Sequence, residues 1–399
     1  MKIFKKCFLL VAVLALSIAF AAIARAADSE YGLVVNGEAV VFEEEGTVPI
    51  NINGRLLFPL RTLFEYIDDG EGSLEWVDEE RMVTLCLGDI ELKLWIGDPE
   101  AEINGEKAEI LDGVAPVIHN DRTYLPLRFV AETFGMVVGW NDEYRTASVV
   151  DGDAYEAMKA IFAGSENETE KLAMDMLMNM DIAISLTSEE GIEEDSASFD
   201  IAAACEIDTE NAFTHITASA NILGETAEVE LYMLGEQMYM KVDDEWETAS
   251  LDELTDGLGF DTAGFADFLD MADLEQFAEA YDPYLTMGLS VNDDGDFVVK
   301  GIIYLPADLI DSLLGSALDM LGGLDGFDIS FQPAVITFVL DKETMALTGL
   351  QLALSMSMEM DLMGMNMSMS ISYVITIDNI DYAPSFESVI PDEIIEEAA

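Results

Sequence analysis

The chain has few histidine and cysteine residues for its length of 399 residues. It contains two histidines, His119 and His215, and three cysteines. Copper and zinc centres need several imidazole or thiolate ligands gathered at one point, so this chain cannot build a histidine-rich metal centre. So few cysteines also exclude a disulfide framework. Cys205 alternates with apolar neighbours such as Ile201 and Ile207, so we expect it to be a buried free thiol.

Basic residues are also scarce. Lysine and arginine together number 17, against 80 aspartates and glutamates, and the formal net charge is -63. Such a charge repels phosphate backbones and anionic membranes, which excludes nucleic acid as a partner. The acidic residues are interpreted either as a solvated surface, which we favour, or as a calcium-binding surface. The best candidate calcium loop, residues 293–296 (DDGD), lacks the remaining spacing and the final glutamate, and is predicted to be a hairpin turn.

The sequence lacks the short motifs that mark common catalytic sites. It has no glycine-rich phosphate loop, no GxSxG, no HExxH and no Cys/His pair with metal-ligand spacing. Carboxylate pairs occur throughout so acidic a chain, so their presence does not identify a glycosidase-like couple. We therefore expect a protein that is not an enzyme and that uses no cofactor.

Residues 1–26 have the pattern of a secretory signal peptide. Three lysines precede an apolar stretch, and Ala24-Arg25-Ala26 supplies a small-x-small cleavage site. The mature chain is expected to begin at Ala27, without a lipid on Cys7, which lies inside the apolar stretch. No later segment reaches the ~18–20 consecutive apolar residues of a membrane helix. The protein is thus predicted to be secreted, on the extracellular side of the cell envelope.

The N-terminal third of the chain contains one pattern twice. Residues 55–61 (RLLFPLR) and 122–128 (RTYLPLR) each run into a short apolar segment, and a tryptophan and an aspartate follow each. The spacing of roughly 67 residues suits one small supersecondary unit per copy. Each copy is predicted to contain a hairpin, a strand, a short helix and a second hairpin. In the second copy a hairpin turns at Asn104-Gly105, and the helix covers 127–134 and ends at Gly135.

This tandem pattern resembles the stalk-type domain named after the N-terminus of copper amine oxidase, with residues 27–151 as its extent. In that family the domain is a non-catalytic appendage, so the resemblance implies a stalk or adaptor module without copper. A copper amine oxidase centre would need a histidine cluster that two histidines cannot form. We therefore predict no stoichiometric copper and no amine oxidase activity.

The paired residues Arg61/Arg128 and Trp76/Trp140 allow two interpretations. They could line a groove that binds sugar or peptide. Alternatively, each tryptophan fills the space between sheet and helix, and each arginine pairs with a neighbouring carboxylate. We favour the structural interpretation, because a fold requirement explains repetition in both copies better than one asymmetric site does.

After a helical linker at 152–170, residues 171–399 show the period-two alternation of strands with one buried face. The segments 174–186, 199–207 and 213–222 carry it, and the other face is serine, threonine, aspartate and glutamate, so two-sided burial is not expected. Two acidic or leucine-rich stretches, 251–284 and 306–324, are predicted to be helices inserted between hairpins. The predicted fold is α+β: an N-terminal tandem βα-repeat domain followed by a curved antiparallel half-barrel with helices on its concave face.

Two hairpins are predicted where the apolar residues of neighbouring strands change between odd and even residue numbers across a short loop. Four-residue loops at 234–237 and 361–364 would pair Met233 with Met238 and would place Met358 and Met367 face to face. On this register the inward rows are rich in methionine, a flexible side chain that fills irregular cores and also lines promiscuous apolar sites. The candidate ligand-binding residues are Met176, Met178, Met180, Met238, Met240, Met356, Met358, Met365, Met367 and Met369.

The half-barrel pattern is similar to that of lipoprotein-carrier proteins of the LolA/LppX type, on the segment 235–241 (GEQMYMK), Trp246 and the ending 390–393 (IPDE). This resemblance implies a curved sheet that binds an apolar ligand. Two hypotheses follow. The first is a secreted, non-enzymatic envelope protein with a stalk or adaptor module and a half-barrel that binds a lipid-like ligand. The second is a structural or adhesive surface protein with a filled half-barrel, whose stalk repeats contact cell-wall polymer. The sequence does not indicate the oligomeric state.

Overall fold

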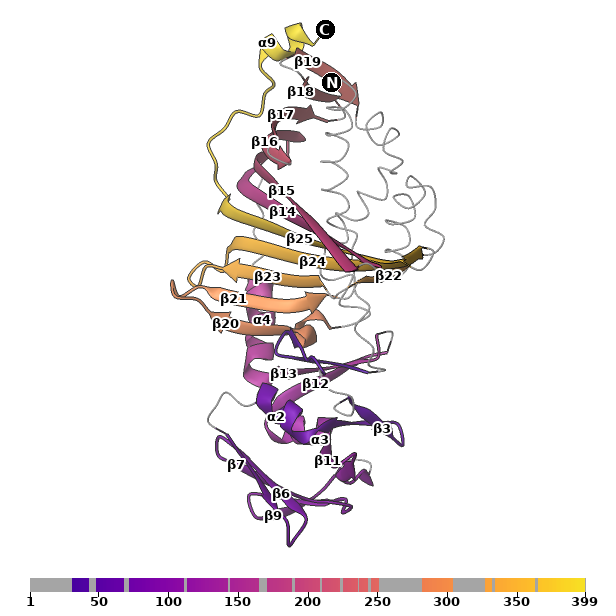
Figure 1. The fold of residues 1–399 in the computed structure, drawn as a ribbon. Coiled ribbons are helices and arrows are strands. Elements are labelled where there is room, and N and C mark those ends of the chain that lie inside the picture. Colours follow the sequence, from indigo (N-terminus) through magenta and orange to yellow (C-terminus); the bar gives the residue numbers. More distant parts are fainter. Residues whose placement is uncertain are drawn as a thin grey trace.

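The computed structural model describes most of the chain from Tyr31 to Ala398. The described residues are 31–42, 48–67, 72–110, 113–142, 144–164, 171–188, 191–208, 210–222, 225–235, 237–242, 245–250, 282–303, 327–331, 334–362 and 365–398. The protein is mostly β and elongated, with small sheets at one end and one large curled sheet at the other (Figure 1). The signal peptide predicted at 1–26 lies outside the described residues, as do the helix predicted at 306–324 and nearly all of that at 251–284.

The N-terminal part contains a five-stranded sheet and two four-stranded sheets around a common core. The five-stranded sheet is a meander of β5 (Ser73–Val77), β6 (Met82–Leu87), β7 (Ile90–Trp95), β8 (Glu100–Ile103) and β9 (Glu106–Glu109). The second sheet has the order β10 (Val117–His119), β11 (Arg122–Pro126), β4 (Arg55–Pro59), β3 (Ile50–Ile52). The third has the order β12 (Met136–Asn141), β13 (Thr146–Asp151), β1 (Gly32–Val35), β2 (Glu38–Ala39).

The two repeated segments, 55–61 and 122–128, lie side by side. Strands β4 and β11 pair antiparallel with Leu125 opposite Phe58, and a helix follows each strand: α2 (Leu60–Ile67) and α3 (Leu127–Thr133). The predicted strand and helix of the second copy are thus confirmed, and Gly135 has the positive φ of 80° expected of a residue that ends a helix. The hairpin predicted at Asn104-Gly105 is also present, as β8 and β9.

Local backbone geometry recurs between the two copies. Asn36 and Asn104 have φ of 47° and 50°, and each precedes a glycine with φ near 80°. Arg81 and Arg145 have φ of 48° and 49°. A positive φ is uncommon for residues other than glycine, and asparagine tolerates it best. The same unusual conformation at matched positions therefore reflects matched turns.

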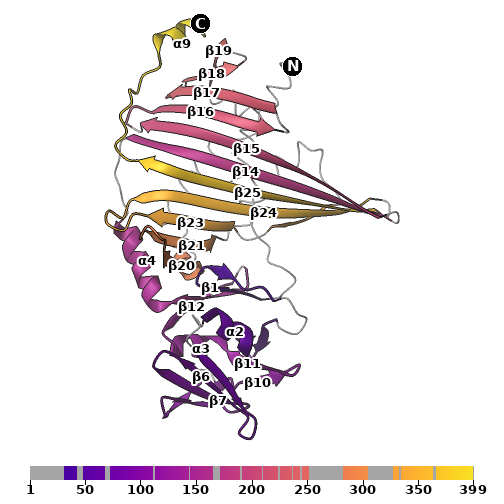
Figure 2. The same ribbon diagram turned by 60° about the vertical axis from the view of Figure 1, so that its left-hand side comes forward.

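The large sheet contains twelve strands, and every strand pair in it is antiparallel. Its first half has the order β19 (Glu245–Ser250), β18 (Gln237–Val242), β17 (Glu225–Leu234), β16 (Phe213–Ile222), β15 (Gly191–Asp208), β14 (Lys171–Ser188). It continues with β25 (Met365–Asp381), β24 (Leu347–Leu362), β23 (Ala334–Leu340), β21 (Phe297–Ile303), β20 (Met287–Val291), and β22 (Phe327–Phe331) pairs with β24. Figure 2 shows the central long strands extending beyond their neighbours as the sheet curls into a half-barrel.

The predicted strands are confirmed, and so is one of the two predicted hairpin registers. Met233 pairs with Met238 as expected, but Leu234 also pairs with Gln237, so the turn is two residues shorter than predicted. The second hairpin also has a shorter turn, but here the register itself is shifted by two residues: Leu362 pairs with Met365, which places Met358 opposite Met369 instead of Met367. A four-residue and a two-residue loop preserve the same parity, so parity alone cannot distinguish them. The DDGD segment is the predicted turn, between β20 and β21.

Helix α4 (Gly152–Gly164) joins the N-terminal part to the large sheet. Its buried residues Met158 and Ile161 share a core cluster with Val150 of β13 and with Met287 and Val299 of the large sheet. Tyr155 of α4 donates a hydrogen bond to Asp282, which caps the short 3-10 helix η2 (Pro283–Thr286). The junction between the two parts is therefore packed with apolar side chains.

No helix among the described residues is long and apolar enough to cross a membrane.

Candidate functional site

The central part of one face of the large sheet is apolar from strand to strand, whereas Glu193 and Asp195 lie on the same face near the start of β15. Residues directly opposite one another in a ladder lie on the same face, so the register defines rows across the sheet. The row through Met178 runs toward β20 as Ile375, Leu352, Ile336, Gly301 and Met287, and toward β17 as Ile201, Ala220 and Ala227. No charged or hydrogen-bonding side chain interrupts this row.

The predicted site residues fall on this face where their side chains are described. Met176, Met178 and Met180 of β14 lie opposite Ile377, Ile375 and Tyr373 of β25. Met178, Met238 and Met240 are buried, whereas Met176, Met180 and Met369 are half-buried. For Met356, Met358, Met365 and Met367 the structure describes the strand pairing alone, within β24 and β25.

Two titratable groups report how apolar this face is. Tyr373, opposite Met180, is 4% exposed, and burial raises its pKa to about 12. Cys205 lies opposite Met174, and burial raises the pKa of its thiol. Cys205 is a free, buried thiol as predicted. The surroundings of both groups disfavour charge.

Helix α4 covers one end of the apolar face. Phe338 of β23 shares a row with Met176, through Leu350 and Ile377. The ring of Phe162, from α4, packs edge-on against Phe338 with 5.3 Å between ring centroids. At this end the apolar face is therefore filled by the protein's own side chains, as in an ordinary core.

The opposite face carries an aromatic cluster that the sequence analysis missed. Phe213, Tyr232, Tyr239 and Trp246 gather on strands β16–β19, where the C-terminal segment covers them with Phe386, Ile390 and Ile394. Helix α9 (Asp392–Glu397) belongs to this cover (Figure 1). Met238, Tyr239 and Met240 are consecutive in β18 and are all at most 9% exposed. The expectation that burial is one-sided is therefore wrong at this end of the sheet. The signal that could have shown this is the set of aromatic residues at the strand positions that otherwise carry polar side chains.

Trp76 and Trp140 do not fill the space between sheet and helix, contrary to the favoured interpretation. Trp76 and Trp140 are 38% and 37% exposed. Their ring N–H groups donate to Asp78 and Asp142, at 3.4 and 3.2 Å. The expected pairing of arginine with carboxylate is present but long, since Arg128 Nε lies 3.9 Å from Glu132 Oε1.

Within the described residues, no group of three or more histidine, cysteine or acidic side chains is arranged to hold a metal ion.

Comparison with protein families matches residues 34–149 to the copper amine oxidase N-terminal domain. This match covers the N-terminal domain of that family and not its catalytic domain. A comparison with curated proteins gives no match.

Several solved structures resemble part of the chain. LprF from Mycobacterium bovis has 13% identity and a TM-score of 0.24, over 59% of this chain and 95% of that one. A DUF1329 family protein from Desulfovibrio piger has 10% identity and a TM-score of 0.17, over 59% and 94%. A putative outer membrane lipoprotein-sorting protein domain from Vibrio parahaemolyticus has 10% identity and a TM-score of 0.13, over 61% and 97%. The segment 34–149 matches the copper amine oxidase N-terminal domain, as the repeated motif predicted.

Proposed function

We propose that this is a non-enzymatic cell-envelope protein whose half-barrel binds an apolar, lipid-like ligand on its methionine-rich face. The row through Met178 carries the proposal, because it presents apolar side chains across much of the sheet. Methionine adapts its shape to irregular partners and suits a site that accepts flexible hydrocarbon chains. Among the described residues, helix α4 packs on this face near β20, β21 and β23, and the ligand would lie over β14–β18 and β25.

The proposal extends to the organisation of the chain. A signal peptide at 1–26 would export the protein, a stalk-like tandem βα-repeat domain would span 27–151, and the half-barrel would follow a helical linker. The matched left-handed residues of the two copies and the pairing of β4 with β11 support the tandem repeat. The packed junction at α4 supports an adaptor role, because a stalk fixed to the sheet can hold the ligand face at a set position.

The experiment is organic extraction of the purified mature protein, followed by mass spectrometry of the extract. Co-purification of an acyl-bearing species that Met180→Glu reduces would support the proposal. The second candidate, a structural or adhesive surface protein that contacts cell-wall polymer, predicts an empty extract and a half-barrel filled by its own side chains. The outward-facing Asp181→Asn is the matched control, since Asp181 is exposed on the same strand.

A further inference from the structure

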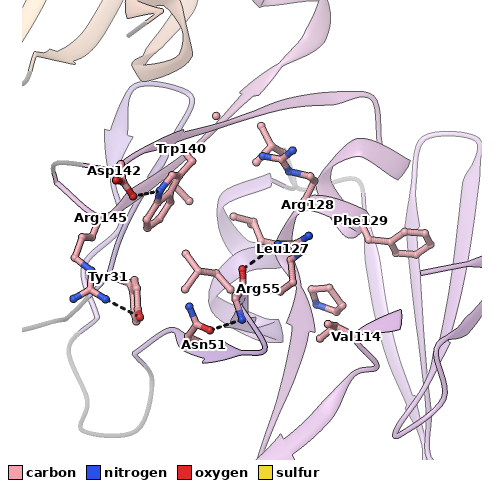
Figure 3. A pocket seen from close by; sticks show the side chains of 16 residues that line it. Tyr31, Asn51, Arg55, Val114, Leu127, Arg128, Phe129, Trp140, Asp142 and Arg145 are labelled. Atoms are coloured by element: carbon pink, nitrogen blue, oxygen red, sulfur yellow. Dashed lines mark hydrogen bonds between the residues drawn. The ribbon is translucent and has the colours of Figure 1, made fainter. Parts of the chain in front are cut away.

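A pocket of about 530 Å³ lies in the N-terminal part, away from the half-barrel. Its walls come from the hairpin β3–β4, the start of α3 and the strands β12 and β13 (Figure 3). Arg55, Arg128, Arg145, Tyr31 and Trp140 line it together with apolar side chains such as Leu127. Figure 3 shows Arg145 and Tyr31 on one side of this space and Arg128 on the other.

The charge of this pocket is opposite to that of the protein. Acidic residues outnumber basic ones 80 to 17 in the chain, yet among the described residues three arginines and one aspartate line the pocket. Arginine presents a planar fork of N–H donors that matches a carboxylate in two parallel hydrogen bonds. Salt screens charges beyond about 8 Å at physiological ionic strength, so the nearby groups set the field that a small anion meets in the pocket. Glu132, 3.9 Å from Arg128, and Asp142 offset part of the charge of the three arginines, and the described groups together stay net positive.

Contacts within the pocket orient two of these arginines, Arg145 and Arg55. Arg145 Nη2 donates to the Tyr31 hydroxyl at 2.8 Å, and its guanidinium carbon lies 4.5 Å from the centre of the Tyr31 ring. Arg55 Nη1 donates to the Gly54 carbonyl at 3.2 Å. The one aspartate, Asp142, accepts the Trp140 ring N–H. A guanidinium carries five N–H donors, more than any one of these contacts uses.

Two aromatic rings add a flat apolar surface beside the arginines. Trp140 is 37% exposed, and its ring centroid lies 6.4 Å from that of Tyr31. The C–H face of a sugar ring stacks on such a surface, whereas an extended acidic peptide has no comparable flat face. An acidic sugar offers both groups: a carboxylate that the arginines can bind and a ring that can stack on Trp140.

We propose that this pocket binds a carboxylate-bearing sugar, such as a uronic acid residue of a cell-wall polysaccharide. The arginines would receive the carboxylate, and Trp140 would stack on the sugar ring. The proposal is independent of the apolar ligand of the half-barrel, so either can fail without the other.

The first copy of the repeat supplies matched controls. Trp76 and Arg81 share the local geometry of Trp140 and Arg145, including the tryptophan-to-aspartate hydrogen bond and the left-handed arginine, but they do not line this pocket. Arg145→Gln and Arg81→Gln therefore remove the same charge from the same backbone conformation. Trp140→Phe and Trp76→Phe form a second matched pair.

The test is titration calorimetry of the full mature chain with trigalacturonic acid, with the neutral galactose trimer and triglutamate for comparison. The sugar acid is expected to bind wild type, and Arg145→Gln and Trp140→Phe should each weaken binding roughly tenfold or more. Arg81→Gln and Trp76→Phe should bind as wild type does. If Arg145→Gln does not fold, the tryptophan pair alone decides. The proposal is overturned if the sugar acid does not bind at millimolar concentration, if the neutral trimer or triglutamate binds as well, or if the two copies respond alike.

Discussion

The ammonium group of Lys171 lies 3.6 Å from the carboxylate of Asp208, at the point where the C-terminal segment crosses the half-barrel. Lys171 also donates to the Phe386 carbonyl at 2.9 Å, and the Ser388 hydroxyl donates to Asp208. Asp208 is 1% exposed and accepts further hydrogen bonds from Asn211. The hydrogen bonds from Ser388 and Asn211, with Lys171 adding attraction, hold the pKa of Asp208 well below its usual range.

Replacing Asp208 should release the C-terminal segment. In Asp208→Asn, the ion pair with Lys171 is lost, and hydrogen exchange at 383–398 should accelerate. In the wild type, the contribution of Asp208 is complete above its unfolded pKa of about 3.9 and is lost as the pH falls toward the lower folded value. The variant should therefore show less of this acid-dependent loosening. The exposed Asp378→Asn is the control, and equal effects of the two changes would contradict the role given to Asp208.

The Asn36-Gly37 turn packs directly on the large sheet, and a pair of glycine substitutions tests this junction. A Cβ on Gly37 would lie 2.2 Å from the Lys300 carbonyl oxygen and 2.7 Å from the Gly288 nitrogen. The equivalent Gly105 has the same positive φ, with no atom within 4 Å of such a Cβ. Gly105→Ala should cost about 1–2 kcal/mol from backbone strain alone, whereas Gly37→Ala should cost clearly more because the turn must also move off the sheet. Chemical denaturation measures both, and equal costs would show that the turn is not tightly seated.

The Tyr155–Asp282 hydrogen bond should contribute to stability in a pH-dependent way. The hydrogen bond to Asp282, followed by burial, raises the pKa of Tyr155 to about 12. A raised folded pKa means that the contribution is complete below the unfolded value of about 10 and is lost as the pH rises toward 12. At pH 7, Tyr155→Phe and Asp282→Asn should show a coupling free energy of about 1–2 kcal/mol in a double-mutant cycle. Additive effects of the two changes would rule out the hydrogen bond.

Neighbouring residues of β14 test which face of the sheet is apolar. Met178 is 3% exposed and Leu177 is 43% exposed, although both are large and apolar. Met178→Glu places a carboxylate among apolar side chains and should cost several kcal/mol or abolish folding, whereas Leu177→Glu should change stability by less than about 1 kcal/mol. Thermal unfolding compares them. The inward assignment of the methionines fails if Leu177→Glu is the more damaging change.

Much of the half-barrel was predictable from period and parity. Strand β16 has the predicted bounds, and the pairing of Met233 with Met238 follows from the parity change across one loop. Turn length was not predictable, because loops that differ by two residues preserve the same faces. The aromatic cover of the outer face was missed because its strand residues alternate with the methionines and its remaining members come from the C-terminal segment, distant in sequence.

The N-terminal pocket shows a different limit of sequence analysis. The repeat presents Trp76 and Trp140, with their following arginines, as equivalents. Only tertiary pairing decides that Trp140 and Arg145, not Trp76 and Arg81, meet Arg55 across the pocket. Repetition therefore identified the residues but could not indicate which copy forms a site.

The proposed apolar ligand is tested most directly by native mass spectrometry of the mature protein, purified without detergent from the organism that makes it. The account predicts a mass excess above the polypeptide that corresponds to an acyl-bearing molecule and disappears on organic extraction. Extracted protein should regain this mass when mixed with the extract. A reproducible mass equal to the polypeptide alone, with no uptake from the extract, would contradict a ligand-binding half-barrel.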